Sequence, residues 1–441
     1  MQLSDAVREL GRFAVEVSWT DLDARTAARA LDVVLDTFGV TVAGARTPEL
    51  RRLQATVMDE QGVARPLGTD LRLPATTAAW LDGTAACCLE LDEGNKRARG
   101  HPAAHVVPAL LALAPTVDAD GPAWLSAFVA GHEVATRVSA ATRLHAGVHP
   151  HGNAGTAGGA AAAARMLGLD AAATAAAIDA ATALPLATDF AAALDGSFVR
   201  NTWIGQANVS GIAAARLAAA GLATVDGRAS GTLGRILGEL DVDALVGGLG
   251  DDLAVATGYF KRHASCSYTH PPADAVLELL ADGVVADDVT AIEVATHGLA
   301  AGLDRAATPT RLAAMFSIPY VVAATFVHGR FDTAASGAEA REAADVRRLV
   351  DVTRVVHDPA LDARLPGERV ARVTVTLTSG TRHTVEVPNP VGDVAHHPLT
   401  RDDLVAKLDA LLAPGEATHL LAVVTGLPDA DHAATALAAL P

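Results

Sequence analysis

The chain has 441 residues, of which 50% are hydrophobic but only 4% aromatic, and its formal net charge is −17. This length exceeds that of one ordinary domain and predicts two domains, each with its own hydrophobic core. The negative charge argues against a nucleic-acid or anionic-membrane partner, because such partners select clustered Lys and Arg. An anionic substrate would need a local basic pocket, for which the candidates are Lys96, Arg97, Arg99, Arg200, Lys261 and Arg262.

Three cysteines, Cys87, Cys88 and Cys266, form neither a metal motif nor a redox motif. This pattern predicts a reduced, cytoplasmic protein. The first residues lack the basic and apolar segments of a signal peptide, and no apolar run is long enough for a transmembrane helix. We therefore expect no membrane association.

Residues 1–250 are predicted to be mostly helical. Apolar residues follow helical spacing from 23 to 43 and again from 124 to 138. The segment 155–167 is so rich in Gly and Ala that helices there can approach closely. Gly168 is placed as a C-terminal cap and Asp170 as the next N-cap, which predicts a buried helical hairpin.

The pattern changes after about residue 265. Segments 289–296 and 352–356 are predicted strands, and 370–387 alternates around Ser379-Gly380 as a β-hairpin does. Helices are predicted between these strands, at residues 323–327 and 338–350.

Thr400 is a predicted N-cap, and the leucines after it keep helical spacing. We expect this last helix to pack back onto the first domain. The predicted fold class is mainly α, with a large helical domain formed by residues 1–264 and 393–441 and a smaller α+β domain at 265–392.

The segment from Leu89 to Ala114 combines an acidic cluster, a basic cluster and a His-Pro pair before an apolar helix. Proline is favoured at the first helical position, so His101, before Pro102, is expected at a helix start beside free backbone N–H groups. A histidine there can exchange protons near neutral pH. The alternative is an ordinary capping histidine.

Metal binding is not expected. His101 and His105 have a spacing that suits a metal site, but no third ligand and no His-Glu-x-x-His motif accompany them. A second cluster, His145, His149 and His151, is interrupted by glycines and a proline that break any helix through it.

Lys261 stands just before the predicted domain boundary and is followed by Cys266 and His270, where a cleft between domains is expected. Lys261 could bind a carboxylate or stabilise an enolate-like charge. The alternatives are a solvated lysine at the junction and, for Cys266, a small buried residue. No dinucleotide loop, phosphate loop or nucleophile elbow is present, so nucleotide cofactors and serine-hydrolase chemistry are not expected.

Seven segments taken in order resemble the MmgE/PrpD family, which includes 2-methylcitrate dehydratase, cis-aconitate decarboxylase and iminodisuccinate epimerase. They are DTFGVTVAG (36–44), DGTAACCLELDEGN (82–95), GHPAAHVVPALLALA (100–114), HPHGNAGTAGGAAAAARMLGLD (149–170), YFKRHASCSYTHPPADA (259–275), FSIPYVVAATFVHGRF (316–331) and HPLTRDDLVAKL (397–408). The resemblance covers nearly the whole chain. It implies a helical domain with a smaller α+β lid, a homodimer, and neither a metal nor an organic cofactor.

The resemblance also implies chemistry at a carbon next to a carboxylate. By position, His101 and His149 match the family's active-site histidines, Lys261 its lysine, and His270 the histidine of its lid motif. Such reactions need a base that works near neutral pH and fixed positive charge.

The chain departs from the family pattern at several positions. The family's acidic motif reads Asp, aromatic, Asp, Asp, then Thr or Ser, and the corresponding residues here are Glu90, Leu91, Asp92, Glu93 and Gly94. A longer carboxylate and a missing hydroxyl predict a changed substrate pocket. Arg200 and Cys266 replace a lysine and a histidine of the cis-aconitate decarboxylases, which argues against that reaction because arginine keeps its proton.

The leading hypothesis is a cofactor-independent lyase that dehydrates a small polycarboxylate. One of His101 and His149 would accept a proton and the other would donate one. Lys261 and Arg200 would bind carboxylates, and the remaining candidates for orienting or contacting the substrate are Glu90, Asp92, Cys266 and His270. Decarboxylation, epimerisation and a non-catalytic, metabolite-binding role are the alternatives.

Overall fold

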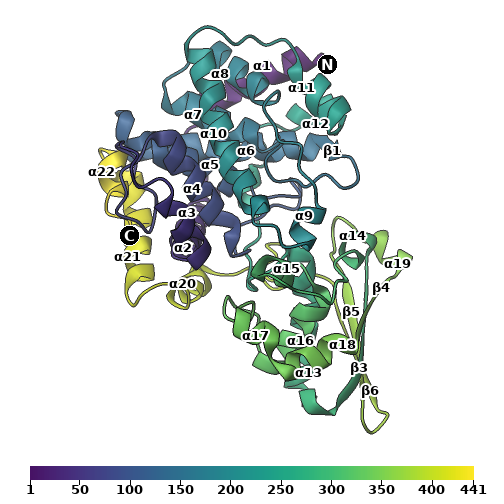
Figure 1. Cartoon of the computed structure of the whole chain (residues 1–441). Helices are drawn as coiled ribbons and strands as arrows, with labels where there is room; N and C mark the ends of the chain where they lie inside the picture. The colour runs from purple at the N-terminus through teal and green to yellow at the C-terminus, as the bar shows by residue number, and fades with distance from the viewer.

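The computed structural model describes all residues, 1–441. A larger helical body lies against a smaller body that carries a sheet (Figure 1). The mainly α fold with a smaller α+β part, predicted from the sequence, is confirmed. The elements of the larger body are α1 (Leu3–Glu16), α2 (Ala24–Ala45), α3 (Pro48–Ala55), α4 (Ala75–Cys88), α5 (Pro102–Leu113), α6 (Gly121–Ala141), α7 (Thr156–Met166), α8 (Ala171–Ala181), α9 (Ala191–Leu194), α10 (Val199–Ala219), α11 (Arg228–Gly231), α12 (Val242–Val246) and the short strands β1 (Thr142–Leu144) and β2 (Gly238–Leu240).

The smaller body is built on a four-stranded sheet in the order β4-β3-β5-β6. β3 pairs in parallel with β4 and antiparallel with β5, and β5 and β6 form a hairpin through the predicted turn at Ser379 and Gly380. Apolar side chains of the sheet pack against α13, α16 and α18. The elements are α13 (His270–Ala281), β3 (Val289–Thr296), α14 (Gly298–Ala301), α15 (Arg311–Met315), α16 (Ile318–His328), α17 (Ala338–Glu342), α18 (Ala344–Asp351), β4 (Thr353–His357), α19 (Pro359–Asp362), β5 (Ala371–Leu377) and β6 (Arg382–Val387).

The predicted caps define the buried hairpin of α7 and α8. Gly168 takes the left-handed conformation, with φ of 70° as glycine allows, and the Asp170 side chain accepts a hydrogen bond from the backbone of Ala173. α7 lies very close to α6, because a Cβ atom on Gly158 would be 2.4 Å from that of Ala135. α7 begins directly after the loop that carries His149 and His151, so this packing holds the loop in place.

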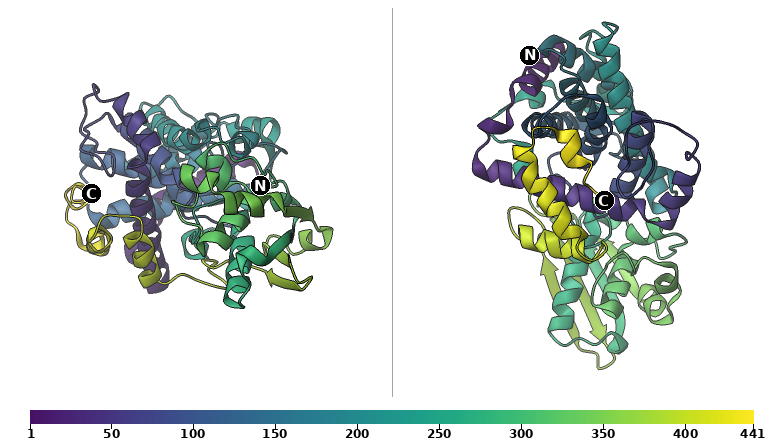
Figure 2. Two further views of the ribbon diagram at one scale, coloured as in Figure 1. Left: turned by 60° about the horizontal axis from the view of Figure 1, so that its bottom comes forward. Right: turned by 90° about the vertical axis from the view of Figure 1, so that its left-hand side faces the viewer.

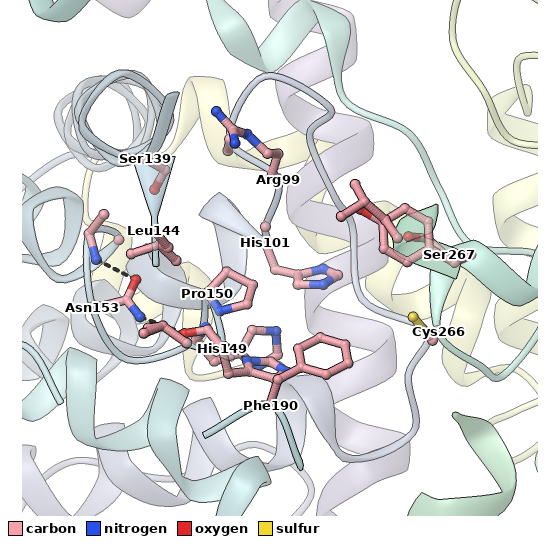
Figure 3. Close-up of a pocket in the computed structure, with 18 of the residues that line it drawn as sticks. Arg99, His101, Ser139, Leu144, His149, Pro150, Asn153, Phe190, Cys266 and Ser267 are labelled. Atoms are coloured by element: carbon pink, nitrogen blue, oxygen red, sulfur yellow. Dashed lines mark hydrogen bonds between the residues drawn. The ribbon is translucent and has the colours of Figure 1, made fainter. Parts of the chain in front are cut away.

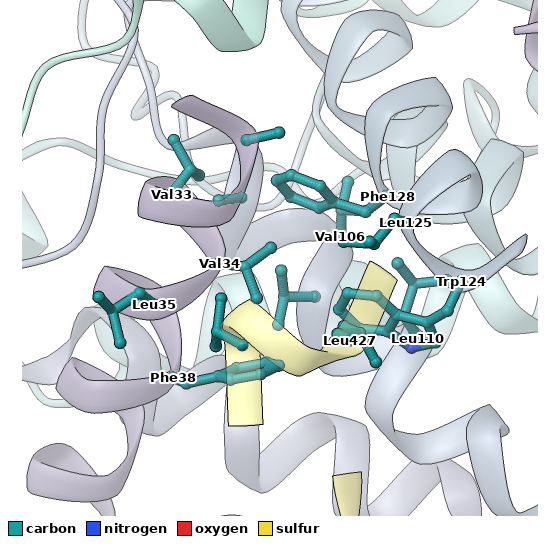
Figure 4. Close-up of a cluster of buried hydrophobic side chains, with 14 of the residues drawn as sticks. Val33, Val34, Leu35, Phe38, Val106, Leu110, Trp124, Leu125, Phe128 and Leu427 are labelled. Atoms are coloured by element: carbon teal, nitrogen blue, oxygen red, sulfur yellow. The ribbon is translucent and has the colours of Figure 1, made fainter. Parts of the chain in front are cut away.

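The tail returns to the larger body and lies across its surface as α20 (Arg401–Asp409), α21 (Glu416–Gly426) and α22 (Ala433–Leu437) (Figure 2). Leu427 is part of the main hydrophobic core with residues of α2 and α6 (Figure 4). The Lys407 ammonium donates to the buried Asp36 carboxylate at 2.6 Å and to the Leu91 carbonyl at 2.8 Å. The tail therefore packs on the first domain, as expected, and reaches the acidic segment.

The hydrophobic clusters fall on the two sides of the predicted division. The main cluster combines α2, α5, α6 and the tail, whereas the second lies within residues 266–387 apart from Ala193 of α9. The boundaries themselves, 1–264 with 393–441 and 265–392, stay a prediction. No helix combines the length and the apolar character needed to cross a membrane.

Replacing Lys407 with Met is expected to lower the melting temperature, because Asp36 would stay buried without its partner. Breaking a buried ion pair from one side costs about 3–5 kcal/mol. The double variant Asp36→Asn/Lys407→Met removes both charges and should recover most of the loss. Thermal unfolding at neutral pH measures both, and an equal loss in the single and double variants would contradict the assignment.

Candidate active site

A cavity of about 490 Å³ lies where the two bodies meet. Figure 3 shows His101, His149 and Phe190 on one side of it and Cys266 and Ser267 on the other. This volume suits a small-molecule ligand. The larger body lines it with residues 98–102 and with the loop between 142 and 155, and the smaller body with residues 266–268, 298–303 and Arg369.

His101 stands at the start of α5, as predicted, with Pro102 as the first helical residue. Its Nδ1 lies 2.7 Å from the Glu93 carbonyl oxygen and 3.0 Å from an Asp92 carboxylate oxygen. Both neighbours only accept hydrogen bonds, so Nδ1 carries the proton and Nε2 is the basic nitrogen. Burial lowers the pKa of His101 below its usual value although Asp92 opposes the shift, so the ring is neutral at neutral pH.

Three buried histidines, His105, His149 and His151, line the cavity beside His101. The His151 ring stands edge-on to its neighbours, with its centroid 5.1 Å from that of His101 and 4.5 Å from that of His149. Burial lowers the pKa of all three, and that of His105 to about 4. The imidazoles of the free site are thus neutral. No group of three or more His, Cys, Asp or Glu side chains is arranged to hold a metal ion.

His149 faces an N–H donor at each of its two ring nitrogens. Its Nδ1 accepts a hydrogen bond from the backbone N–H of His151 at 3.1 Å. Its Nε2 lies 3.4 Å from Nε of Arg200, a group that can only donate. Burial and the Arg200 charge together hold the pKa of His149 well below its usual value.

Four charged side chains, Glu90, Asp92, Arg200 and Lys261, form a closed network at the back of the cavity. The Lys261 ammonium lies 3.0 Å from Glu90 and 2.9 Å from Asp92, and Arg200 pairs with the other oxygen of Glu90. Burial lowers the pKa of Lys261, but the two carboxylates outweigh it and the net shift is upward. Burial likewise opposes ionisation of Asp92, but His101 and Lys261 bring its pKa below the usual value. Two positive and two negative charges therefore cancel.

The predicted site residues lie at two depths. Those that line the cavity are Glu90, His101, His149, Arg200 and Cys266. Asp92 and Lys261 are buried behind the wall in the charge network. His270 is also buried, edge-on to His263, with its Nε2 at 3.2 Å from the Ser265 carbonyl. This placement favours a positioning role for Lys261 and a packing role for His270 in place of the predicted contacts with substrate.

Several lining residues were not recognised from the sequence. The sequence gives His105 no role beyond a metal-like spacing to His101, but in the structure its Nδ1 donates to the His101 carbonyl at 2.8 Å and so supports that residue. In the sequence, His151 stands out only as the third histidine of an interrupted cluster. Arg369 lies just before β5 in no motif, and no local signal distinguishes it from the other arginines of the smaller body.

Gly94 and Tyr259 form an isolated antiparallel bridge between the acidic segment and the segment before Lys261. A Cβ atom on Gly94 would lie 2.4 Å from Cζ of the Tyr259 ring. No side chain fits at position 94 while the ring is there. The ring itself lines the cavity.

Comparison with known families now identifies the chain. A sequence profile of the MmgE/PrpD N-terminal domain matches residues 8–231, and a profile of the MmgE/PrpD C-terminal domain matches residues 263–420. The chain belongs to the MmgE/PrpD family. The resemblance seen in the sequence is thereby confirmed, and the family includes lyases such as dehydratases. No curated protein matches the chain.

The structure gives physical reasons for two departures from the MmgE/PrpD acidic motif. The hydroxyl residue that ends the motif would collide with Tyr259, so Gly94 is required by this neighbour. Glu90 reaches two cations on separate segments, Arg200 and Lys261, with its two oxygens. Its backbone has φ of 52°, a left-handed conformation that costs free energy in residues other than glycine and that the network holds in place.

Replacing Gly94 with Thr is expected to lower the melting temperature, because forcing atoms into a packed contact costs about 1–3 kcal/mol. The same substitution in a Tyr259→Ala background should cost far less, since the ring is gone. The melting temperatures of the wild type, the two single variants and the double variant measure the energetic coupling between Gly94 and Tyr259. An identical cost with and without the ring would show that Tyr259 does not dictate glycine at this position.

Proposed function

We propose that the protein is a lyase that dehydrates a small hydroxylated polycarboxylate. It would remove a proton from a carbon next to a carboxylate and expel hydroxide from the neighbouring carbon. The observation that carries this proposal is His101, whose Nδ1–H is held by Asp92 and the Glu93 carbonyl so that Nε2 is a base on the cavity wall. Such a carbon acid needs this kind of base and fixed positive charge nearby.

In the proposed reaction, Nε2 of His101 takes the proton and the electron pair of the broken C–H bond forms the carbon–carbon double bond. The C–O bond breaks, and the departing hydroxide takes a proton from His149 and leaves as water. Burial and Arg200 keep His149 neutral in the free enzyme. A substrate carboxylate beside Arg200 would raise the pKa of His149, so this residue becomes a proton donor when substrate is bound.

The opposite wall of the cavity favours dehydration over epimerisation, which needs a base on each face of one carbon. That wall carries Cys266 and Tyr268, and burial raises the pKa of the Cys266 thiol to about 11 and also raises that of Tyr268. Neither group is a base at neutral pH. Decarboxylation of the cis-aconitate type is less well supported, because Arg200 cannot release a proton as a lysine can.

Replacing His101 with Gln is expected to lower kcat by about 10²–10⁴-fold, the usual contribution of a general base. The acid limb of kcat/KM in the wild type should have its midpoint below about 6.5, the ordinary pKa of histidine, because burial favours the neutral base. Asp92→Asn should move that midpoint further down, because the carboxylate raises the pKa of His101.

The matched control for these variants is His328→Gln, which changes an exposed histidine at the end of α16. It should leave both the rate and the pH profile unchanged. Full activity of His101→Gln with an unaltered melting temperature would remove this residue from the mechanism.

Hydrogen exchange identifies the substrate even where equilibrium hides net conversion. The wild-type protein, incubated in deuterated water with hydroxylated di- and tricarboxylates, is expected to introduce deuterium next to a carboxylate of its substrate, as read by NMR or mass spectrometry. His101→Gln should abolish this exchange. A ligand that raises the melting temperature without exchange or product would instead indicate a metabolite-binding protein.

A further inference from the structure

Arg369 is a buried cation without a carboxylate partner. Its exposed fraction is 8%, and its side chain lines the cavity. Its Nη1 donates a hydrogen bond to the Ser267 hydroxyl at 3.1 Å, and its guanidinium carbon lies 5.0 Å from the ring centroid of Tyr259 and 5.5 Å from that of Tyr268. These neighbours are neutral, so the positive charge is not balanced within the protein.

The charged groups nearest to Arg369 already have partners of their own. Arg364 and Arg372, the nearest arginines along the chain, both pair with Glu386. Asp393, a carboxylate on a small side cavity that Arg369 also lines, is taken by Lys96. The cations deeper in the site are likewise satisfied, because Arg200 and Lys261 are neutralised by Glu90 and Asp92.

Burying a charge without an opposite charge is costly, and proteins avoid it unless a ligand supplies the partner. Arginine keeps its proton even where burial opposes its charge, so the guanidinium of Arg369 stays positive. The two aromatic faces stabilise a cation but leave its N–H groups available for an anion. The arrangement prepares a cation for a carboxylate that arrives from the cavity.

Arg99 is a second unpaired arginine on the same cavity. It belongs to the larger body, is exposed, and has φ of 50°, a strained conformation for a residue other than glycine. Both arginines lower the pKa of the Tyr268 phenol against the larger effect of burial, so both lie within electrostatic range of that ring. Figure 3 shows Arg99 and Ser267, the partner of Arg369, at the edge of the cavity away from His149.

We propose that Arg369, assisted by Arg99, binds a carboxylate of the substrate that is remote from the reacting carbon. This inference rests on the proposed function and deepens it, because it assigns a second carboxylate of the substrate to a named cation of the smaller body. One carboxylate would lie beside the histidines and Arg200, and the other between Arg369 and Arg99. Because Arg369 belongs to the smaller body and the histidines to the larger one, the substrate would bridge the two.

Binding of inert probes tests this inference without any turnover. Calorimetric titration of the wild type with succinate and with succinamate, its monoamide, should show at least about tenfold tighter binding of the diacid, since a charge-assisted bidentate contact is lost in the amide. In Arg369→Gln the diacid should bind about 10- to 100-fold more weakly and the preference for it should disappear. Arg369→Lys, which keeps the charge but not the bidentate geometry, should recover part of the affinity.

Arg372→Gln is the matched control, because it removes a paired arginine of the same sheet outside the cavity. It should bind succinate as the wild type does. Equal affinity of the wild type for diacid and monoamide, or failure to bind either, would overturn the inference, as would unchanged binding in Arg369→Gln. Should Arg369→Gln fail to fold, the comparison of the two ligands on the wild type still decides.

The two proposals fail separately. Loss of the diacid preference in Arg369→Gln, together with no hydrogen exchange on any polycarboxylate in the wild type, would leave the carboxylate site standing and refute the dehydration. Hydrogen exchange that depends on His101 but not on Arg369 would support the dehydration and refute the carboxylate site. With a turned-over substrate, Arg369→Gln should raise KM more than it lowers kcat, whereas His101→Gln should act on kcat.

Discussion

The site depends on four buried charges that cancel. Glu90 and Asp92 follow α4, Arg200 lies at the start of α10, and Lys261 lies in the connection to the smaller body. Removing any one of them would leave an uncompensated buried charge, at a cost of about 3–5 kcal/mol. The network therefore fixes three chain segments relative to one another before any ligand binds, and through Asp92 it fixes the tautomer and orientation of the His101 ring.

Because these charges cancel, the proton chemistry is left to neutral imidazoles. His101, His149 and His151 have lowered pKa values and hold no extra proton in the free protein. A negatively charged ligand changes this, because each carboxylate stabilises an imidazolium nearby. In the proposed reaction, the binding of an anionic substrate would therefore also supply the proton donor, and a neutral ligand of the same shape would not have this effect.

Features that depend on neighbouring residues could be predicted from the sequence. The strand at 289–296, the caps Asp170 and Thr400, and the position of His101 before Pro102 each follow from a local pattern. The partner of Lys261 could not be predicted, because Glu90 lies 171 positions away and a lysine meets a substrate or a carboxylate according to the fold. For this reason the sequence predicted Lys261 as a substrate contact, whereas the structure places it in a buried charge network.

The departure in the acidic motif and the unpaired arginine are physically linked. Gly94 leaves the space that the Tyr259 ring occupies, and the same ring offers Arg369 an aromatic face at 5.0 Å. A side chain at position 94 would displace the ring and withdraw support from a cation that burial already penalises. Three distant segments therefore act as one unit at the cavity. In the proposed function, this unit would contribute to the choice among carboxylate substrates.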